Sequence, residues 1–470
     1  MSREKSLIKN TIVLSIGTVI PKFASFIVLP ILTGYLTKTE YGTYDLITVL
    51  CSLFLPAVTL QIQTAAFRFL IEKKDDEDGK KTIITNILSF LMPVSIIAII
   101  VLFIVLNKYL LIEKILIGLY FFADMIFCVC GQIARGLQKN KVYAEASIVC
   151  SMANLLFVIV LIYFFKMGFV GVLICMLFSS LIPSLVMIYQ LKLWRYINFK
   201  FLDKKCLKEL LKYSWPMVPN AMSMWVMNAS DRIVVSYFLG IEANAIYAVA
   251  KKIPNIVTIA QSTFTMAWQE SASLAANDKD SSEYYSKMFD VIFCMMTGIM
   301  VCILAAMPIL FKILIRGNYE SAYYQMPILV LGMFFYGLAS YLGGIYVAVK
   351  ETKSVGMTTF LAAIINLITS LLMIKGIGIY AASISTLISY IFLAIYRMKD
   401  IKKHVKIEYN LKKVICIFII LIIISACSYS KKIYVYVFEV VISILVTVFL
   451  NRNLIFSVLK SVQNRKNIKK

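Results

Sequence analysis

Histidine is almost absent from this sequence, and acidic residues are scarce. The 470 residues include one histidine, His404, and 25 Asp and Glu against 48 Lys and Arg. The ten cysteines are scattered and form no CxxC pair. Zinc sites need clustered Cys and His, and disulfide frameworks show regular Cys spacing in small secreted chains. The sequence therefore predicts no metal site, no disulfide framework and no cofactor.

Long polar stretches are also missing, because apolar runs recur along most of the chain. Hydrophobic residues make up 60% of the composition. A helix needs about 20 mainly apolar residues to cross the hydrocarbon core of a bilayer. The predicted fold class is an all-α polytopic membrane protein. The hydropathy pattern indicates about 14 transmembrane helices. Their expected ranges are 10–36, 44–70, 82–106, 115–134, 143–165, 168–191, 213–239, 245–272, 288–311, 322–349, 355–374, 377–396, 414–430 and 433–450.

The net charge of +23 would suggest a nucleic-acid partner in a soluble protein. Here the Lys and Arg residues concentrate at both termini and in alternate loops between the predicted helices. The positive-inside rule then places both termini in the cytoplasm. We expect a multi-pass protein of the plasma membrane, with no nucleic-acid partner.

Four charged residues interrupt the apolar pattern of residues 215–254, where two helices are predicted on either side of a short turn. These residues are Asp231, Arg232, Lys251 and Lys252. A basic side chain at bilayer depth costs roughly 2.5 to 3.5 kcal/mol and normally faces a bundle interior or a watery cavity. The helical rise places Arg232 and Lys251 at a similar depth below the outer face. We predict that the three cations line a cavity that receives an anionic headgroup.

An alternative is that these charges are structural. Asp231 and Arg232 point about 100° apart on a helix, so each has its own surroundings and either can join helices through an ion pair. Long basic side chains can also extend towards the interface. Under this alternative Asp231 is a counter-charge, whereas under the functional one it is a candidate for ion coupling.

Three further charges lie in the first half of the predicted bundle. Lys22 and Asp124 are both expected near the membrane midplane, where a charge must be paired, wetted or neutralised. Lys22 is therefore a candidate cavity cation. Asp124 either pairs with Lys22 or binds a coupling proton or sodium ion. Arg68 lies near the cytoplasmic interface, where anchoring and substrate binding are both reasonable roles.

The basic segment 194–212 divides the predicted helices into two groups of six. Its interleaved aromatic residues are typical of an amphipathic segment on an anionic leaflet. The two halves resemble each other: IVLPILTGYLTKTEYGTYDL, from Ile27, matches RIVVSYFLGIEANAIYAVA, from Arg232, and aligns Tyr44 with Tyr247. Parallel repeats of this kind place a substrate path between the halves. The expected domains are an N-terminal lobe (1–193), the linker (194–212), a C-terminal lobe (213–400), and two peripheral helices with a basic tail (401–470).

The segment GMFFYGLASYLGGIYVAV is rich in glycine and tyrosine. Gly343 and Gly344 favour close helix packing. Tyr336, Tyr341 and Tyr346 are candidates for stacking on sugar rings, and packing within the bundle is the alternative.

These segments resemble the Wzx-type oligosaccharide flippases, polysaccharide transporters of the multidrug/oligosaccharidyl-lipid/polysaccharide (MOP) exporter superfamily. The resemblance rests on KNTIVLSIGTVIPKFASFIVLPILTGYLTKTEYGTYDL, on SDRIVVSYFLGIEANAIYAVAKKIP, and on the paired GFVGV and GIYAA motifs. It implies a V-shaped bundle of two six-helix lobes plus two helices. It also implies alternating access that moves polyprenyl pyrophosphate-linked oligosaccharide to the outer leaflet for O-antigen, capsule or exopolysaccharide. A polysaccharide polymerase and glycosyltransferases are the implied partners.

Family cavities are lined by basic residues, and Lys22, Arg232, Lys251 and Lys252 match that expectation. Such midplane sites often hold arginine, so the lysine at position 22 lacks the planar fork that grips phosphate with two hydrogen bonds. A drug or cation exporter of the same superfamily would instead need acidic cavity residues. A membrane glycan polymerase would need a large external loop, and every predicted outer loop is short. We therefore expect a transporter and not an enzyme.

Overall fold

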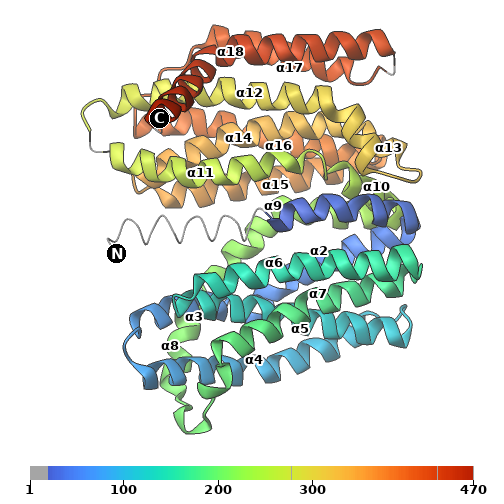
Figure 1. Cartoon of the computed structure of the whole chain (residues 1–470), viewed down its shortest axis with the longest axis vertical. Helices are drawn as coiled ribbons and strands as arrows, with labels where there is room; N and C mark the ends of the chain where they lie inside the picture. The colour runs from blue at the N-terminus through green and yellow to red at the C-terminus, as the bar shows by residue number, and fades with distance from the viewer. Residues whose placement is uncertain (1–19, 277, 431, 469–470) are drawn as a thin grey trace. The chain divides into compact units, whose positions relative to one another are not determined.

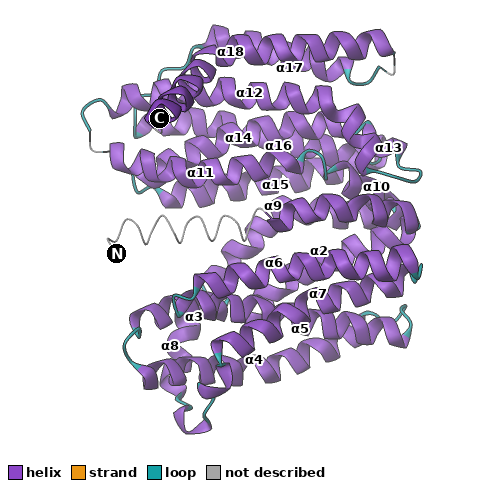
Figure 2. Ribbon diagram, in the orientation of Figure 1, coloured by secondary structure: helices purple, strands orange, loops and turns teal. Residues whose placement is uncertain are grey.

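The structure is a computed structural model that describes residues 20–276, 278–430 and 432–468. Helices joined by turns and short loops make up these ranges (Figures 1 and 2). No strand occurs in those ranges. The chain divides into two compact units, Met1–Trp225 and Val226–Lys470, and the division falls inside helix α9.

The first unit is built around α5, which packs against α3, α4 and α7. Its core contains side chains such as Met125 and Ile133 of α5 and Leu70 of α3, all fully buried. The helices of this unit are Ile20–Tyr35, α2 (Lys38–Thr59), α3 (Ile62–Glu72), α4 (Glu77–Val105), α5 (Leu111–Gly136), α6 (Asn140–Phe157) with its π-helical continuation η1 (Val158–Phe164), α7 (Gly168–Leu191), the 3-10 turns η2 (Leu193–Arg195) and η3 (Phe199–Phe201), α8 (Lys204–Ser214), and the start of α9 (Met217–Leu239).

The second unit is built around α14, which packs against α11, α12 and α16. Trp268 of α11 stacks on Tyr341 of α14 with ring centroids 4.7 Å apart, and its indole Nε1 donates to the Tyr341 carbonyl at 2.9 Å. The helices after α9 are α10 (Ile241–Ala250), α11 (Asn255–Ala275), α12 (Ser281–Leu314), α13 (Glu320–Tyr323), α14 (Met326–Ala348), α15 (Thr352–Ile377), α16 (Tyr380–Asp400) with η4 (Ile401–Lys403), α17 (Leu411–Cys427) and α18 (Ile433–Ile468).

Two of the predicted helices are interrupted. The expected helix 44–70 breaks between α2 and α3, where Leu60 and Gln61 adopt left-handed conformations with φ of 47° and 56°. The expected helix 245–272 breaks between α10 and α11. Propensity and hydropathy do not reveal such breaks inside apolar segments, so the prediction of continuous helices was wrong at both places.

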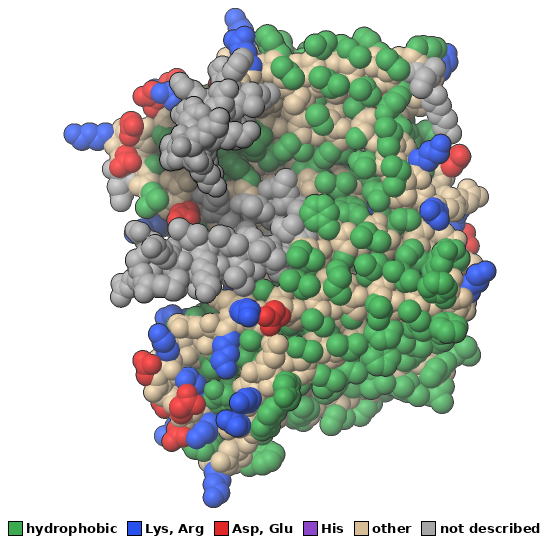
Figure 3. Space-filling view, viewed as in Figure 1, with side chains coloured by type: hydrophobic (Ala, Val, Ile, Leu, Met, Phe, Trp, Pro, Cys, Tyr) green, Lys and Arg blue, Asp and Glu red, His purple; other side chains and the backbone are tan. Residues whose placement is uncertain are grey.

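Much of the protein surface is apolar. Ten described helices are long and apolar enough to cross a membrane. On α4 the side chains of Ile96, Ile97, Ile100, Val101 and Ile104 are each more than half exposed. Figure 3 shows hydrophobic side chains over much of the visible face. A soluble monomer rarely exposes so much apolar surface, and the predicted class of all-α polytopic membrane protein is confirmed.

The first glycines of the paired motifs both have a positive φ. Gly168 of GFVGV and Gly378 of GIYAA have φ of 58° and 59°, a region that side chains with a Cβ rarely adopt. At Gly168 a Cβ would also lie 2.6 Å from the Oε1 of Glu40. That carboxylate accepts a hydrogen bond from the Phe169 N–H at 2.9 Å, which fastens the start of α7 to the start of α2.

The basic segment after α7 packs against its own unit. Leu210 of α8 is fully buried in the core of the first unit. Thr85 of α4 donates to the Tyr196 carbonyl at 2.9 Å, and the Asn86 amide donates to the Phe201 carbonyl at 3.1 Å. Part of the apolar face of this segment therefore contacts α3 and α4, while lysines such as Lys208 remain exposed.

The C-terminal helices pack against the core of the second unit. Ile417 and Leu421 of α17 are part of its buried cluster. Asn451 of α18 donates to the Cys294 carbonyl of α12 at 3.1 Å. A Cβ at Gly298 would lie 2.9 Å from the Asn451 amide nitrogen, so α18 lies directly on α12.

Candidate functional site

The break between α10 and α11 places Lys251 in a turn. Pro254 at the N-cap of α11 has no N–H to donate and disfavours helical geometry at the preceding residue. The intervening residues 251–254 form a turn in which the Asn255 N–H donates to the Lys251 carbonyl at 3.0 Å. Because α10 ends here, Lys251 lies beside α9, which carries Asp231 and Arg232.

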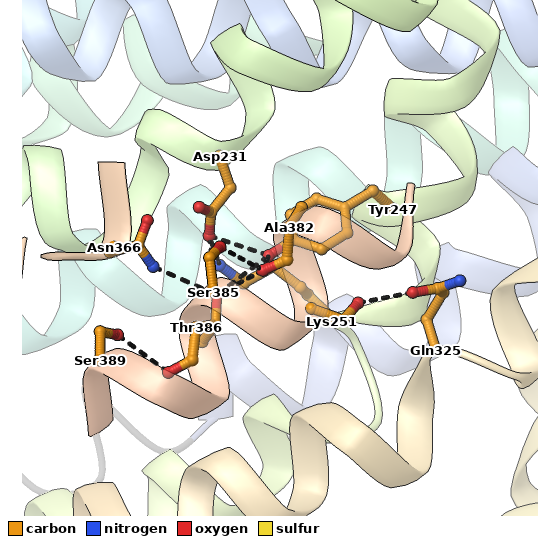
Figure 4. Close-up of polar contacts among 10 residues, drawn as sticks. Asp231, Tyr247, Lys251, Gln325, Asn366, Ala382, Ser385, Thr386 and Ser389 are labelled. Atoms are coloured by element: carbon orange, nitrogen blue, oxygen red, sulfur yellow. Dashed lines mark hydrogen bonds and ion pairs between the residues drawn. The ribbon is translucent and has the colours of Figure 1, made fainter. Parts of the chain in front are cut away.

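Asp231 lies at the centre of a buried polar cluster (Figure 4). Its side chain is 1% exposed, and its Oδ2 accepts hydrogen bonds of 2.9 Å from the Tyr247 hydroxyl and from the Thr386 hydroxyl. The ammonium of Lys251 lies 3.8 Å from the same oxygen. The Asn366 amide reaches the Thr386 hydroxyl at 3.4 Å. The cluster therefore joins α9, α10, α15 and α16 around one carboxylate.

Arg232 and Lys251 line one cavity of about 530 Å³ in the second unit. That volume lies within the range of about 300 to 1,000 Å³ for small-molecule sites. None of the described residues that line it is acidic. The other lining residues are polar or aromatic with one methionine: Asn255, Thr258, Gln261, Thr265, Met333, Tyr336, Ser340 and Tyr390. The chemistry of the lining, two cations among neutral hydrogen-bonding groups, suits an anion.

The polar side of the cavity comes from α11, whose polar face was not predicted from the sequence. Asn255, Thr258, Gln261 and Thr265 follow one another at spacings of three, three and four residues, which places them on one face of a helix. Gln261 donates through Nε2 to the Ser340 hydroxyl at 2.8 Å. A search for polar residues at helical spacing within apolar segments would have found this face.

The three tyrosines singled out on α14 have different surroundings. Tyr336 lines the cavity, and its ring centroid lies 4.9 Å from that of Tyr390. Tyr341 is buried and donates to the Tyr285 carbonyl at 2.6 Å, and Tyr346 is buried and donates to the Asp400 carboxylate at 2.8 Å. Only the first of the three is therefore placed to contact a molecule in the cavity.

The remaining candidate residues lie elsewhere. Lys252 is half-buried next to Lys251 and is not among the residues that line the cavity. The other three belong to the first unit. Arg68 forms a surface ion pair with Glu72, with Nη2 2.8 Å from Oε1. Asp124 accepts a hydrogen bond from the Ser180 hydroxyl at 3.4 Å, and Lys22 is half-buried on the helix Ile20–Tyr35.

The sequence matches a known family over residues 7–272, more than half of the chain, and the description of that family is polysaccharide biosynthesis protein. The matched region runs into α11 and includes Asp231, Arg232 and Lys251. A curated relative, an uncharacterized membrane protein of Methanocaldococcus jannaschii, is 23% identical over 320 residues. That match covers 64% of this chain and 61% of the relative, so this chain spans less than two thirds of the length of the relative.

Solved structures of the MOP superfamily share the fold. The lipid II flippase MurJ, in an inward closed conformation, superimposes with a TM-score of 0.72 at 17% identity, covering 94% of this chain and all of MurJ. An inward-facing multidrug resistance MATE family transporter of the MOP superfamily has a TM-score of 0.66 at 16% identity, covering 84% and 99%. A MOP superfamily transporter from Pyrococcus furiosus, described as having a binding pocket of reverse polarity, has a TM-score of 0.56 at 16% identity, covering 85% and 96%.

Proposed function

Because the chain belongs to the polysaccharide biosynthesis protein family and has the fold of MOP superfamily transporters, we propose that it is an oligosaccharide flippase. Its substrate is a polyprenyl pyrophosphate-linked oligosaccharide, which moves from the cytoplasmic to the outer leaflet for surface polysaccharide synthesis. The protein acts as a transporter and catalyses no covalent step. A polysaccharide polymerase and glycosyltransferases are its expected functional partners.

The observation that carries this proposal is the charge of the cavity. Arg232 and Lys251 face a space whose described lining contains no acid, while the Asp231 carboxylate, 3.8 Å from the Lys251 ammonium, accepts its hydrogen bonds within the buried cluster. Charge-assisted hydrogen bonds from such cations to phosphate are about twice as strong as neutral ones. A drug or cation exporter is the alternative within this superfamily. Two basic lining residues would not strengthen the binding of its cationic substrate.

The other candidate residues take supporting roles in this proposal. Lys22, Lys252 and Arg68 add positive charge along the path of the headgroup. Asp231 acts as the counter-charge that holds Lys251 at the cavity, and it is also a candidate for ion coupling. Asp124 in the first unit is a second candidate for coupling to a proton or sodium gradient.

The proposed architecture is fourteen spans, of which the first twelve form two lobes of six helices. The lobes are residues 1–193 and 213–400, the linker is 194–212, and residues 401–470 add the last two helices and a basic tail. The protein lies in a bacterial plasma membrane, with both termini on the cytoplasmic side. Alternating access then arises from rocking of one lobe against the other.

An inside-negative potential assists this direction of transport. Moving one elementary charge across the membrane changes its free energy by about 2.3 kcal/mol per 100 mV. The headgroup is an anion that moves outwards, so the field favours translocation even without a coupled ion.

Direct measurement of headgroup binding tests the proposal. Purified protein in nanodiscs is titrated with a polyprenyl pyrophosphate, using Arg232→Gln and Lys251→Gln singly and together. Each substitution should weaken binding by about 10- to 150-fold, because one charge-assisted contact contributes about 1.5 to 3 kcal/mol. Lys375→Gln, at an exposed lysine of α15, is the matched control.

Arg232→Lys separates charge from geometry in the same assay. Lysine keeps the charge but lacks the planar fork of arginine, so binding should fall part of the way towards that of Arg232→Gln. If the double Gln variant binds the pyrophosphate lipid as tightly as the unmodified protein, at equal abundance in the membrane, the cationic-cavity proposal is wrong.

A further inference from the structure

A second cavity, of about 370 Å³, lies at one end of the second unit and is lined mainly by aromatic rings. We call it the tyrosine cavity. Its lining residues are Pro308, Phe311, Glu320, Tyr323, Tyr324, Ser430 and Tyr436. They come from the end of α12, from α13 and the residue after it, from the connection between α17 and α18, and, for Tyr436, from α18 itself. The basic-loop asymmetry of the sequence assigns this end of the helices to the outer side of the membrane.

The walls of the tyrosine cavity are fastened together. The Tyr323 hydroxyl donates to the Ser428 carbonyl at 2.9 Å, and the Ser428 hydroxyl donates to the buried carboxylate of Glu439 at 2.5 Å. The Tyr429 hydroxyl donates to the Tyr324 carbonyl at 3.1 Å, and the two rings stack with centroids 6.2 Å apart. These contacts tie the turn between α17 and α18 to α13, so the cavity is formed before any ligand enters. Preformed walls reduce the entropy lost on binding.

The chemistry of the lining favours an uncharged sugar over other ligands. Aromatic rings present negative faces that attract the C–H groups of a sugar ring. The Glu320 carboxylate and the Ser430 hydroxyl are polar groups that can bond sugar hydroxyls. A purely apolar ligand would desolvate these groups without replacing their hydrogen bonds.

Helix α14 runs from the edge of the tyrosine cavity to the cationic cavity. Tyr324 lies two residues before the start of α14 at Met326, and the same helix reaches the cationic cavity at Met333 and Tyr336. From Met326 these positions are seven and ten residues further along the helix, or roughly 10 to 15 Å at 1.5 Å per residue. This length along α14 corresponds to a few sugar rings.

We propose that the tyrosine cavity is an outer-side subsite for the uncharged glycan portion of the substrate, separate from the site for its pyrophosphate. This inference rests on the proposed flippase function. It divides recognition between two sites, with charge recognised at Arg232 and Lys251 and sugar recognised at Tyr436 and Glu320.

The test compares two probes that differ only in sugar. One is a synthetic polyprenyl pyrophosphate without sugar, and the other is the same lipid carrying a neutral hexose oligosaccharide. Tyr436→Ala should weaken binding of the glycan-bearing lipid by about 2- to 12-fold, the range that follows from about 0.5 to 1.5 kcal/mol per aromatic contact. Binding of the bare lipid should be unchanged. Tyr434→Ala is the matched control, because Tyr434 is 63% exposed on the same helix and lies outside the cavity lining.

Three outcomes would overturn the inference. The first is equal binding of the glycan-bearing lipid by Tyr436→Ala and the unmodified protein. The second is an equal loss for both probes, which indicates a structural or lipid-tail effect. The third is preferential binding of a quaternary ammonium probe that Glu320→Gln abolishes, which makes the cavity a cation site. If Arg232→Gln leaves bare-lipid binding intact while Tyr436→Ala still weakens the glycan-bearing lipid, the pyrophosphate site is wrong and the glycan subsite stands.

Discussion

At the scale of single residues, two neighbours on α9 have opposite surroundings. Asp231 is buried among the hydroxyls of Tyr247 and Thr386, whereas Arg232 lines the cavity. Lys251 belongs to both environments, since its ammonium lies 3.8 Å from Asp231 and also lines the cavity. The ion pair and the cationic cavity, posed as alternatives from the sequence, thus occur together in one arrangement.

The buried pair makes a prediction about abundance. Lys251→Gln removes one partner and leaves the Asp231 carboxylate in a site that is 1% exposed. Removing one partner of a buried pair typically costs about 3 to 5 kcal/mol. We therefore expect less Lys251→Gln protein in the membrane, measured by quantitative immunoblot and thermal stability in detergent.

The double variant Lys251→Gln/Asp231→Asn identifies the cause. Neutralising the acid should restore abundance, because no uncompensated charge remains buried. Pyrophosphate binding should stay weak, since the cavity still lacks one cation. Recovery of binding together with abundance would mean that Lys251 has only a structural role.

Asp124 provides a separate prediction on ion coupling. Its carboxylate is half-buried in α5 and accepts a hydrogen bond from Ser180. If it binds the coupling ion, Asp124→Asn should remove the dependence of transport on a proton or sodium gradient without changing substrate affinity. Flux assays in proteoliposomes with each gradient imposed in turn measure this. Ser180→Ala, which keeps the charge, should retain the dependence, and unchanged gradient dependence in Asp124→Asn would reduce Asp124 to a structural role.

At the scale of helices, the break before Pro254 and the packing of α14 form the cavity. The break ends α10 at Ala250 and lets α11 begin with its polar face towards α14. On the other side, α14 comes close to α11 because Gly344 has no side chain. A Cβ at Gly344 would lie 2.4 Å from Cδ1 of the Trp268 indole ring, closer than atoms can pack.

Two glycine substitutions test this close approach. Gly344→Ala should destabilise the protein by about 1 to 3 kcal/mol, the usual cost of overpacking a core. Gly356→Ala is the matched control, because a Cβ there meets nothing within 4 Å on α15. Alanine in a helix is more favourable than glycine by about 0.8 to 1.0 kcal/mol, so this variant should be unchanged or more stable. Thermal unfolding in detergent measures both, and equal stability of the two variants would contradict the packing argument.

At the scale of the whole molecule, the exposed apolar surface and the basic loops describe a membrane protein whose proposed cargo is an anion. In proteoliposomes with the cytoplasmic face inside, outward transport of the glycan lipid should therefore speed up as the interior is made more negative. A potassium gradient with valinomycin sets the potential, and a fluorescent glycan lipid reports the flux. The field contributes about 2.3 kcal/mol per net charge per 100 mV. A rate that does not change with potential would mean that a coupled cation neutralises the moving charge.

The amino-acid sequence determined the properties that depend on local composition. Apolar runs predicted a membrane protein built of helices, because a segment in lipid must satisfy its own backbone hydrogen bonds and a helix does so. The glycine-containing motifs and the segment SDRIVVSYFLGIEANAIYAVAKKIP indicated the family. Isolated charges at bilayer depth pointed to Asp231, Arg232 and Lys251, because burying an ion is expensive wherever it occurs.

The tertiary structure decided which of those residues meet. Lys251 and Arg232 share a cavity because α10 ends at Ala250 and returns Lys251 beside α9, and no local pattern specifies that contact. Thr386 donates to Asp231 from 155 residues further along the chain, and Tyr247 donates to the Ala382 carbonyl over a separation of 135 residues. The tyrosine cavity likewise needs α12, α13 and α18 together. Such sites arise from packing between distant segments, and a single sequence records the side chains but not their neighbours.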